Sequence, residues 1–244
     1  MSSSLFISTL IRYLRRIRFE CPDNVPRQGT ALMVVSHSSP ADLFYCLALM
    51  QHVGRADCRF VVSADMLESD RFRGYTRTTI AGSNPLMRSW AAVAAGAGAF
   101  VVPRFFRSVD VIPIYREGDD SESRQQVLSS LLGGKLVTIA PEWGNDSHRN
   151  VTGLRPLTHG VAAIARRFFE TTHEPLTLVP VALAEPGRQF WEGVRVRVGT
   201  PYHGMSDQHY PELFAGTEPA DQETRREAYR HFTGDLGRRL RELT

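Results

Sequence analysis

Short β-branched runs alternate with helical patterns along most of the chain. The runs that predict strands are Ala31–Ser36, Phe60–Ser63, Val111–Tyr115, Leu136–Ala140, Thr177–Leu183 and Val194–Val198. Apolar spacings of three and four, with turn residues between them, predict helices over Pro40–His52, Glu122–Leu132, Leu157–Phe169 and Asp221–Leu243. Strands separated by helices are typical of crossover connections. The pattern therefore predicts an α/β fold, with a mainly parallel central sheet flanked by helices and a C-terminal helix.

The first segment, LFISTLIRYLRRIRF, predicts an N-terminal amphipathic helix. At about 100° per residue its apolar side chains fall on one arc. Arg12, Arg15 and Arg16 fall opposite, and Arg18 lies at the apolar border. The apolar stretch is too short to span a bilayer, and its charges follow it, unlike those of a signal peptide. We expect residues 1–20 to form a membrane-surface helix. A helix packed on its own domain fits the pattern equally well.

The longest apolar run, WAAVAAGAGAFVVP at Trp90–Pro103, is also too short to cross a membrane. Its small residues allow close backbone approach, which leaves two interpretations open. The run is either an ordinary core segment or the wall of an acyl-chain groove.

Length and composition limit the possible classes of protein. The chain has 244 residues, with 42% hydrophobic and 23% charged residues, which excludes wholesale disorder and a polytopic membrane protein. We expect residues 21–244 to form a single domain. Its three cysteines lack CxxC spacing, so we expect reduced thiols and a protein that faces the cytosol.

The charge is distributed unevenly. The 29 basic and 26 acidic side chains nearly cancel, but residues 1–18 carry four arginines and no carboxylate. A local basic excess favours an anionic partner, and no basic stripe runs through the rest of the chain. We therefore expect membrane lipids as partners and no nucleic acid. These features predict a peripheral protein on the cytoplasmic face of the membrane.

The most informative stretch is VVSHSSPADLFY, where a predicted strand runs directly into a helix start. Ser39 is a suitable N-cap and Pro40 suits the first helical position, so Asp42 fits a capping role. The alternative is that the chain turns between His37 and Asp42 and brings the carboxylate to the imidazole. A carboxylate there fixes the tautomer and stabilises the imidazolium that forms when the free nitrogen takes a proton. Active sites of α/β proteins lie at the ends of strands, which favours a catalytic pair.

At this point the chain resembles the glycerophospholipid acyltransferases of the 1-acylglycerol-3-phosphate acyltransferase family. The first signature of that family is a histidine and an aspartate separated by four residues, matched by His37 and Asp42. Ser36 stands where the family often has asparagine.

The second signature ends in an arginine after an apolar strand, and DVIPIYR places Arg116 there. The usual glycine of this block is Asp110 and the usual phenylalanine is Pro113.

The third signature, Pro-Glu-Gly-Thr-Arg-Ser, corresponds to APEWGND. Pro141 and Glu142 match, but Trp143 replaces the glycine and the arginine is absent. Arg149 and Arg155, later in the same segment, are candidates to replace it. A last short signature, an apolar strand with Val-Pro, appears as LVPVAL.

The resemblance implies transfer of a fatty acyl group from acyl-CoA or acyl-carrier protein to a hydroxyl of a lysophospholipid. It implies His37 as general base and Asp42 as its orienting carboxylate. It assigns acceptor binding to Arg116, Pro141, Glu142, Gly144 and Arg149. An exposed arginine without function is the alternative for Arg116, and a loop-capping carboxylate for Glu142. Apart from the thioester co-substrate we expect no cofactor, and the histidine spacing predicts no metal site.

Two other functions stay open. Serines flank His37, as in a lipid or thioester hydrolase, but the chain lacks a GxSxG elbow. The altered third block leaves room for a non-catalytic lipid-binding protein on the same scaffold.

Overall fold

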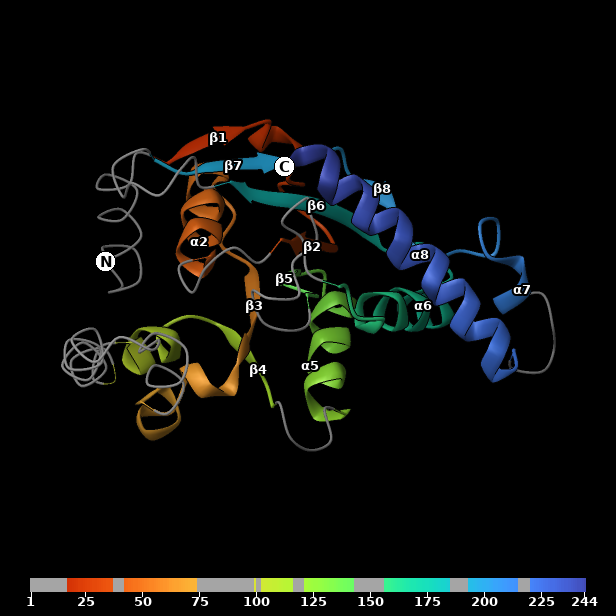
Figure 1. The fold of residues 1–244 in the computed structure, drawn as a ribbon, viewed down its shortest axis with the longest axis horizontal. Helices are drawn as coiled ribbons and strands as arrows, with labels where there is room; N and C mark the ends of the chain where they lie inside the picture. The colour runs from red at the N-terminus through yellow and green to blue at the C-terminus, as the bar shows by residue number, and fades with distance from the viewer. Residues whose placement is uncertain are drawn as a thin grey trace.

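The computed structural model describes residues 17–36, 42–73, 99, 102–115, 121–142, 156–184, 193–214 and 220–244. Its centre is an eight-stranded sheet (Figure 1). The strands are β1 (Arg18–Glu20), β2 (Ala31–Val35), β3 (Cys58–Ser63), β4 (Val111–Ile114), β5 (Leu136–Ile139), β6 (Thr177–Ala184), β7 (Arg195–Val198) and β8 (Tyr202–His203).

The strands follow the order β1-β7-β6-β2-β5-β3-β4, and β8 also pairs with β6. β6, β2, β5, β3 and β4 are mutually parallel. β7 and β8 run antiparallel to β6, and β1 runs parallel to β7. The mainly parallel sheet is confirmed, and all six predicted strands are present. The parallel strands end together at what we call the carboxyl end of the sheet, where β1 and β7 begin.

Helices cover both faces of the sheet (Figure 1). The α-helices include α2 (Asp42–Val53), α5 (Ser121–Leu132), α6 (Gly160–Thr172), α7 (Pro211–Phe214) and α8 (Gln222–Leu243), and two 3-10 turns are η1 (Pro22–Asn24) and η2 (Ala64–Met66). The predicted C-terminal helix is confirmed as α8. Its N-cap is Asp221, whose carboxylate accepts a hydrogen bond from the Thr224 amide nitrogen at 2.8 Å.

Strand β2 divides the core into two layers. Leu32 and Val34 face the cluster formed with α5, α6 and α8. Met33 and Val35 face the cluster formed with α2, and the whole strand is buried. A strand covered on both faces is expected to be continuously apolar, as ALMVV is.

Two sequence predictions need correction. Residues 18–20 form strand β1, so they cannot belong to the predicted helix over residues 1–20; residues 1–16 lie outside the described part. The strand explains why Arg18 does not fit the polar face of the predicted helix. Successive side chains of a strand point to opposite faces, so Phe19 lies on the α2 side of the sheet and Arg18 on the other. Residues 157–159 are also not helical: Leu157 forms a β-bridge with Glu142, and α6 begins at Gly160.

Two further observations concern the apolar run Trp90–Pro103 and membrane-spanning helices. Most of Trp90–Pro103 lies outside the described residues, although Ala99 is buried. In the parts of the chain that the structure describes, none of the helices has the length and apolarity needed to cross a bilayer.

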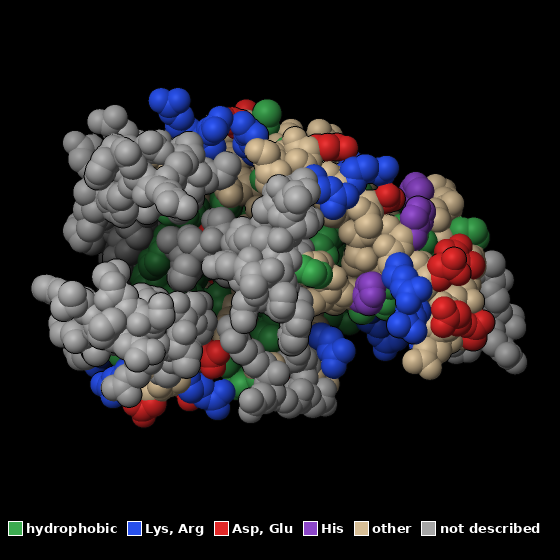
Figure 2. Space-filling view, viewed as in Figure 1, with side chains coloured by type: hydrophobic (Ala, Val, Ile, Leu, Met, Phe, Trp, Pro, Cys, Tyr) green, Lys and Arg blue, Asp and Glu red, His purple; other side chains and the backbone are tan. Residues whose placement is uncertain are grey.

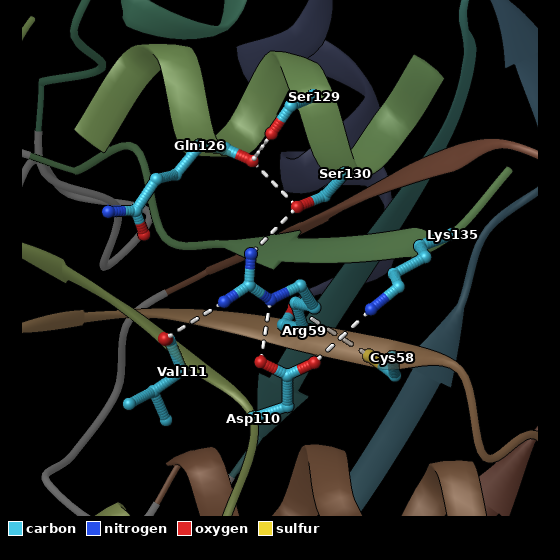
Figure 3. Close-up of polar contacts among 8 residues, drawn as sticks. All are labelled: Cys58, Arg59, Asp110, Val111, Gln126, Ser129, Ser130 and Lys135. Carbon is cyan, nitrogen blue, oxygen red and sulfur yellow. Dashed lines mark hydrogen bonds and ion pairs between the residues drawn. The ribbon is translucent and has the colours of Figure 1, made fainter. Parts of the chain in front are cut away.

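The amino end of the sheet is held by ion pairs (Figure 3). Arg59 Nε lies 2.7 Å from Asp110 Oδ1, and its Nη1 donates to Ser130 Oγ at 3.0 Å. Lys135 Nζ lies 3.4 Å from the other oxygen of Asp110. These contacts join the beginnings of β3, β4 and β5 to α5. Asp110, which replaces the usual glycine of the second block, therefore has a structural partner in this chain.

Arg55 makes a second, buried anchor at the amino end. Its side chain is fully buried and donates to the carbonyl oxygens of Pro26 and Gly29. Its Nε also lies 2.8 Å from Asp57 Oδ1, and this guanidinium lowers the pKa of the Asp57 carboxyl. The loop before β2 and the start of β3 are thereby fastened together.

Candidate active site

The last described residue before His37 is fixed by two hydrogen bonds to β6. Ser36 is buried, its amide nitrogen donates to the Val181 carbonyl at 2.9 Å, and its Oγ accepts a hydrogen bond from the Leu183 amide at 3.1 Å. The hydrogen bonding between β2 and β6 thus continues one residue past the end of β2. In the second of these bonds the Ser36 hydroxyl accepts, where a backbone carbonyl would normally do so. The point from which His37 follows in sequence is therefore held to β6. His37 itself lies outside the described residues.

Asp42 lies in the first described turn of α2 and is buried. Its carboxylate is near Cys46, one turn later. Burial is the main reason that the pKa of the Cys46 thiol is raised, and the negative charge of Asp42 raises it further. The structure thus places a buried carboxylate on the helix that follows His37. The proposed N-cap, Ser39, and the helix start at Pro40 lie outside the described residues.

Pro141 and Glu142 follow the neighbouring parallel strand β5. Val34 of β2 is the register partner of Ile139 of β5. Ser36 and Pro141 each come two residues after these partners, so the two strands leave the sheet at the same level. The His–Asp block and the Pro–Glu block therefore start from adjacent strands at the carboxyl end of the sheet.

Both residues of the Pro–Glu block take part in closing a loop. Glu142 forms a β-bridge with Leu157, and the Thr158 amide donates to the Pro141 carbonyl at 2.8 Å. These contacts hold residues 141–142 next to residues 157–158. Gly144 and Arg149, which lie between them in sequence, are outside the described residues.

Strand β4 leads toward Arg116 from the margin of the sheet. β3 lies between β5 and β4, and Ser63 is the register partner of Ile114. Pro113 fits this position because β4 is an edge strand, where a missing N–H need not interrupt the sheet. Its carbonyl accepts a hydrogen bond from Ser123 Oγ at 2.6 Å, which ties β4 to α5. Arg116, two residues past β4, lies outside the described residues.

The fourth block is structural in the described chain. Pro180 of β6 is the register partner of Val34, and its carbonyl accepts from the Gly199 amide at 2.8 Å. A Cβ at Gly199 would meet the Pro180 ring at 2.9 Å, so the close approach needs glycine there. The Val-Pro signature thus supports the strand that holds Ser36.

Sequence reasoning missed one residue of this site. It noted Ser36 only as a substitution, whereas the hydroxyl makes the last link between β2 and β6. The only local signal was a small polar side chain at the end of an entirely apolar strand.

The described side chains hold two buried thiols, Cys46 and Cys58, and one exposed thiol, Cys21. All three cysteines are free, as expected. Burial raises the pKa of Cys58 to about 12, so this thiol stays protonated. Within the described ranges no three His, Cys, Asp or Glu side chains are grouped to hold a metal ion.

Comparisons with known proteins find similarity only at the level of solved structures. No protein-family model matches the chain, and no curated protein matches it. Among solved structures, the chain is similar to the 1-acyl-sn-glycerophosphate (LPA) acyltransferase PlsC from Thermotoga maritima. The identity is 12% over 99% of this chain and 82% of that chain, with a TM-score of 0.49. Values this low do not assign an activity, so the function has to be argued from the residues of this chain.

Proposed function

We propose that the chain transfers a fatty acyl group from a thioester, acyl-CoA or acyl-carrier protein, to a hydroxyl of a lysophospholipid. The observation that carries the proposal is the arrangement of β2 and β5. These adjacent parallel strands leave the sheet in register, one at Ser36 directly before His37 and the other at Pro141–Glu142. Carboxyl ends of parallel strands are where open α/β sheets bind their ligands.

In this proposal His37 is the general base. It removes the proton from the acceptor hydroxyl as the oxygen attacks the thioester carbonyl, and the thiol of the donor leaves. Asp42 orients the ring and stabilises the imidazolium. The burial of Asp42 supports this role, because a carboxylate shielded from water interacts more strongly with a nearby imidazolium.

Arg116 and Arg149 are the proposed phosphate contacts, since a guanidinium pairs two of its N–H groups with phosphate oxygens. Neighbouring strands are about 4.8 Å apart, so β4 lies about 14 Å from β2 across β5 and β3. The phosphate and the reacting hydroxyl of a lysophospholipid are only a few bonds apart, so in this proposal the long side chain of Arg116 extends from β4 toward β2. Glu142 is proposed to hold a glycerol hydroxyl or one of the arginines, and Pro141 and Gly144 to shape the loop.

The test is His37→Ala, assayed with a panel of acyl donors and lysophospholipid acceptors. The measurement follows both thiol release and acylated lipid. A general base contributes about 10²- to 10⁴-fold, so turnover should fall by that factor while the unfolding midpoint is unchanged. Asp42→Asn should lower turnover less.

Turnover like that of the wild type in His37→Ala would contradict the proposal. Free fatty acid in place of acylated lipid would instead assign a hydrolase, and lipid binding without turnover across all donors would assign a non-catalytic protein.

A further inference from the structure

Strands β1 and β7 present arginines side by side on one face of the sheet. Arg18 is the register partner of Arg195, and Glu20 is the register partner of Arg197. Directly opposed side chains of a strand pair lie close together, so the first pair opposes like charges, which destabilises a sheet. Figure 2 shows basic side chains gathered over this part of the molecule.

Only one of the three arginines on this face is neutralised. Arg197 Nε lies 2.6 Å from Glu20 Oε2, and its Nη1 donates to the Leu243 carbonyl at 2.9 Å at the end of α8. The carboxylate of this strand pair and the negative end of the helix dipole are therefore engaged by Arg197. Within the described residues, neither Arg18 nor Arg195 has a carboxylate within ion-pair distance.

The topology places these two arginines at the same end of the sheet as the candidate active site. β7 is antiparallel to β6, and β6 is parallel to β2. Arg195 is the register partner of Ala184, the last residue of β6, and Arg18 lies beside it. The ends of β2 and β6 and the beginnings of β7 and β1 therefore face the same way. Arg18 is exposed, and α8 ends beside Arg197, which comes two residues after Arg195 on β7 (Figure 1).

We propose that Arg18 and Arg195 form a contact for the anionic headgroups of a lipid bilayer, on the side where the active site opens. The inference deepens the proposed function, on which it rests, by naming the surface that turns the site toward its lipid acceptor. Two like charges held next to each other without a carboxylate gain most when an extended anionic surface supplies the counter-charge.

An acidic carrier protein is the competing partner. The bilayer is favoured by the sequence directly before β1, in which Arg12, Arg15 and Arg16 alternate with apolar residues. A lipid surface uses both charge and apolar area, whereas an acidic protein surface uses the charge alone.

The test is the double variant Arg18→Gln/Arg195→Gln, with Arg226→Gln/Arg230→Gln as the matched control. The control removes the same charge from exposed positions on α8. Binding is measured by sedimentation with phosphatidylglycerol/phosphatidylcholine vesicles, at low salt and at high salt. Each arginine near an anionic surface is typically worth about 1 kcal/mol, so the double variant should bind about tenfold to thirtyfold more weakly at low salt. The control should bind like the wild type, and high salt should remove the difference.

Equal loss in both variants, or loss in neither, would overturn the inference. So would weaker binding to an acidic acyl-carrier protein with unchanged vesicle binding. Arg18→Gln/Arg195→Gln should unfold at the wild-type midpoint or above it, because it removes a repulsion and breaks no ion pair among the described residues. The control should keep the wild-type midpoint. His37→Ala separates the two proposals, since it should lose turnover and keep vesicle binding. If the wild type transfers no acyl group but vesicle binding still depends on the arginine pair, only the proposed function fails.

Discussion

The two ends of the central sheet are built differently. At the amino end, charged side chains are paired: Arg59 with Asp110, Lys135 with the same carboxylate, and Arg55 with Asp57. At the carboxyl end, hydrogen bonds fix Ser36, directly before His37, and Pro141 of the Pro–Glu block, and Arg18 and Arg195 have no carboxylate partner among the described residues. The first end uses its charges for stability. The second keeps rigid positions and unneutralised charge, as a binding site needs.

The largest effect is expected for Arg55→Met, which tests whether the amino end of the sheet serves stability alone. The change removes the buried guanidinium that donates to the carbonyl oxygens of Pro26 and Gly29, and each lost hydrogen bond to this charged donor costs about 1–3 kcal/mol. We expect urea denaturation to show a loss of about 2–5 kcal/mol in the free energy of unfolding. Turnover per folded molecule should change little, because the anchor lies at the opposite end from the site. An equal fall in turnover would show that the two ends are coupled.

The two buried thiols, one near each end of the sheet, should make the stability of the protein depend on pH. Cys58 contacts Thr138 near the amino end at 3.4 Å, and Cys46 lies near Asp42. Both thiols have a raised pKa in the folded state, so above about pH 8.5 the unfolded chain loses their protons first. Stability is fully present below that pH and falls as pH rises, by up to about 2.7 kcal/mol per pH unit for two thiols.

The measurement is denaturation between about pH 8 and pH 9.5, because closer to pH 10 the unfolded chain also loses tyrosine protons. Burial raises the pKa of Tyr202 and Tyr210 in the folded state, and their contribution is the same in the wild type and the variant. The variant Cys46→Ala/Cys58→Ala should have a flatter pH dependence, whatever its stability at neutral pH. A slope as steep as that of the wild type would mean that other groups cause the alkaline loss.

The smallest expected effect on stability comes from removing one hydroxyl at each end of the sheet. Ser36→Ala leaves the Leu183 amide without its acceptor, and Ser130→Ala leaves one N–H group of Arg59 without its acceptor. Each change should cost about 1–2 kcal/mol of stability. Only Ser36→Ala should also lower acyl transfer, by about tenfold, because a small displacement of the base reduces the rate.

Ser36→Asn, the residue common in the resembled family, keeps an acceptor and should restore part of the activity. Equal turnover in Ser36→Ala and Ser130→Ala would show that Ser36 serves only the fold.

The strands were predictable from the sequence because their signal is local. The buried run ALMVV and the β-branched runs after it follow from alternating or continuous apolar positions, and each forms a strand. The C-terminal helix was predictable for the same reason, and Gly234 within it is tolerated because a side chain there would meet open space.

The remaining features depend on partners far along the chain. The three residues of β1 carry no strand signal of their own, and become a strand only because β7 is beside them. Leu157 fits a helical pattern, but it forms a β-bridge with Glu142 instead of belonging to α6. For the candidate site, the sequence indicated which strands lead to it and the structure shows two of them ending in register. The geometry between His37 and Asp42 stays a prediction.

The bond between Arg197 and Glu20 joins residues that are 177 positions apart. During synthesis β1 is made before β7, which is its sheet partner among the described strands. Contacts between such distant residues form slowly, since a long loop must close first. In a nascent chain β1 therefore stays unpaired until β7 has left the ribosome.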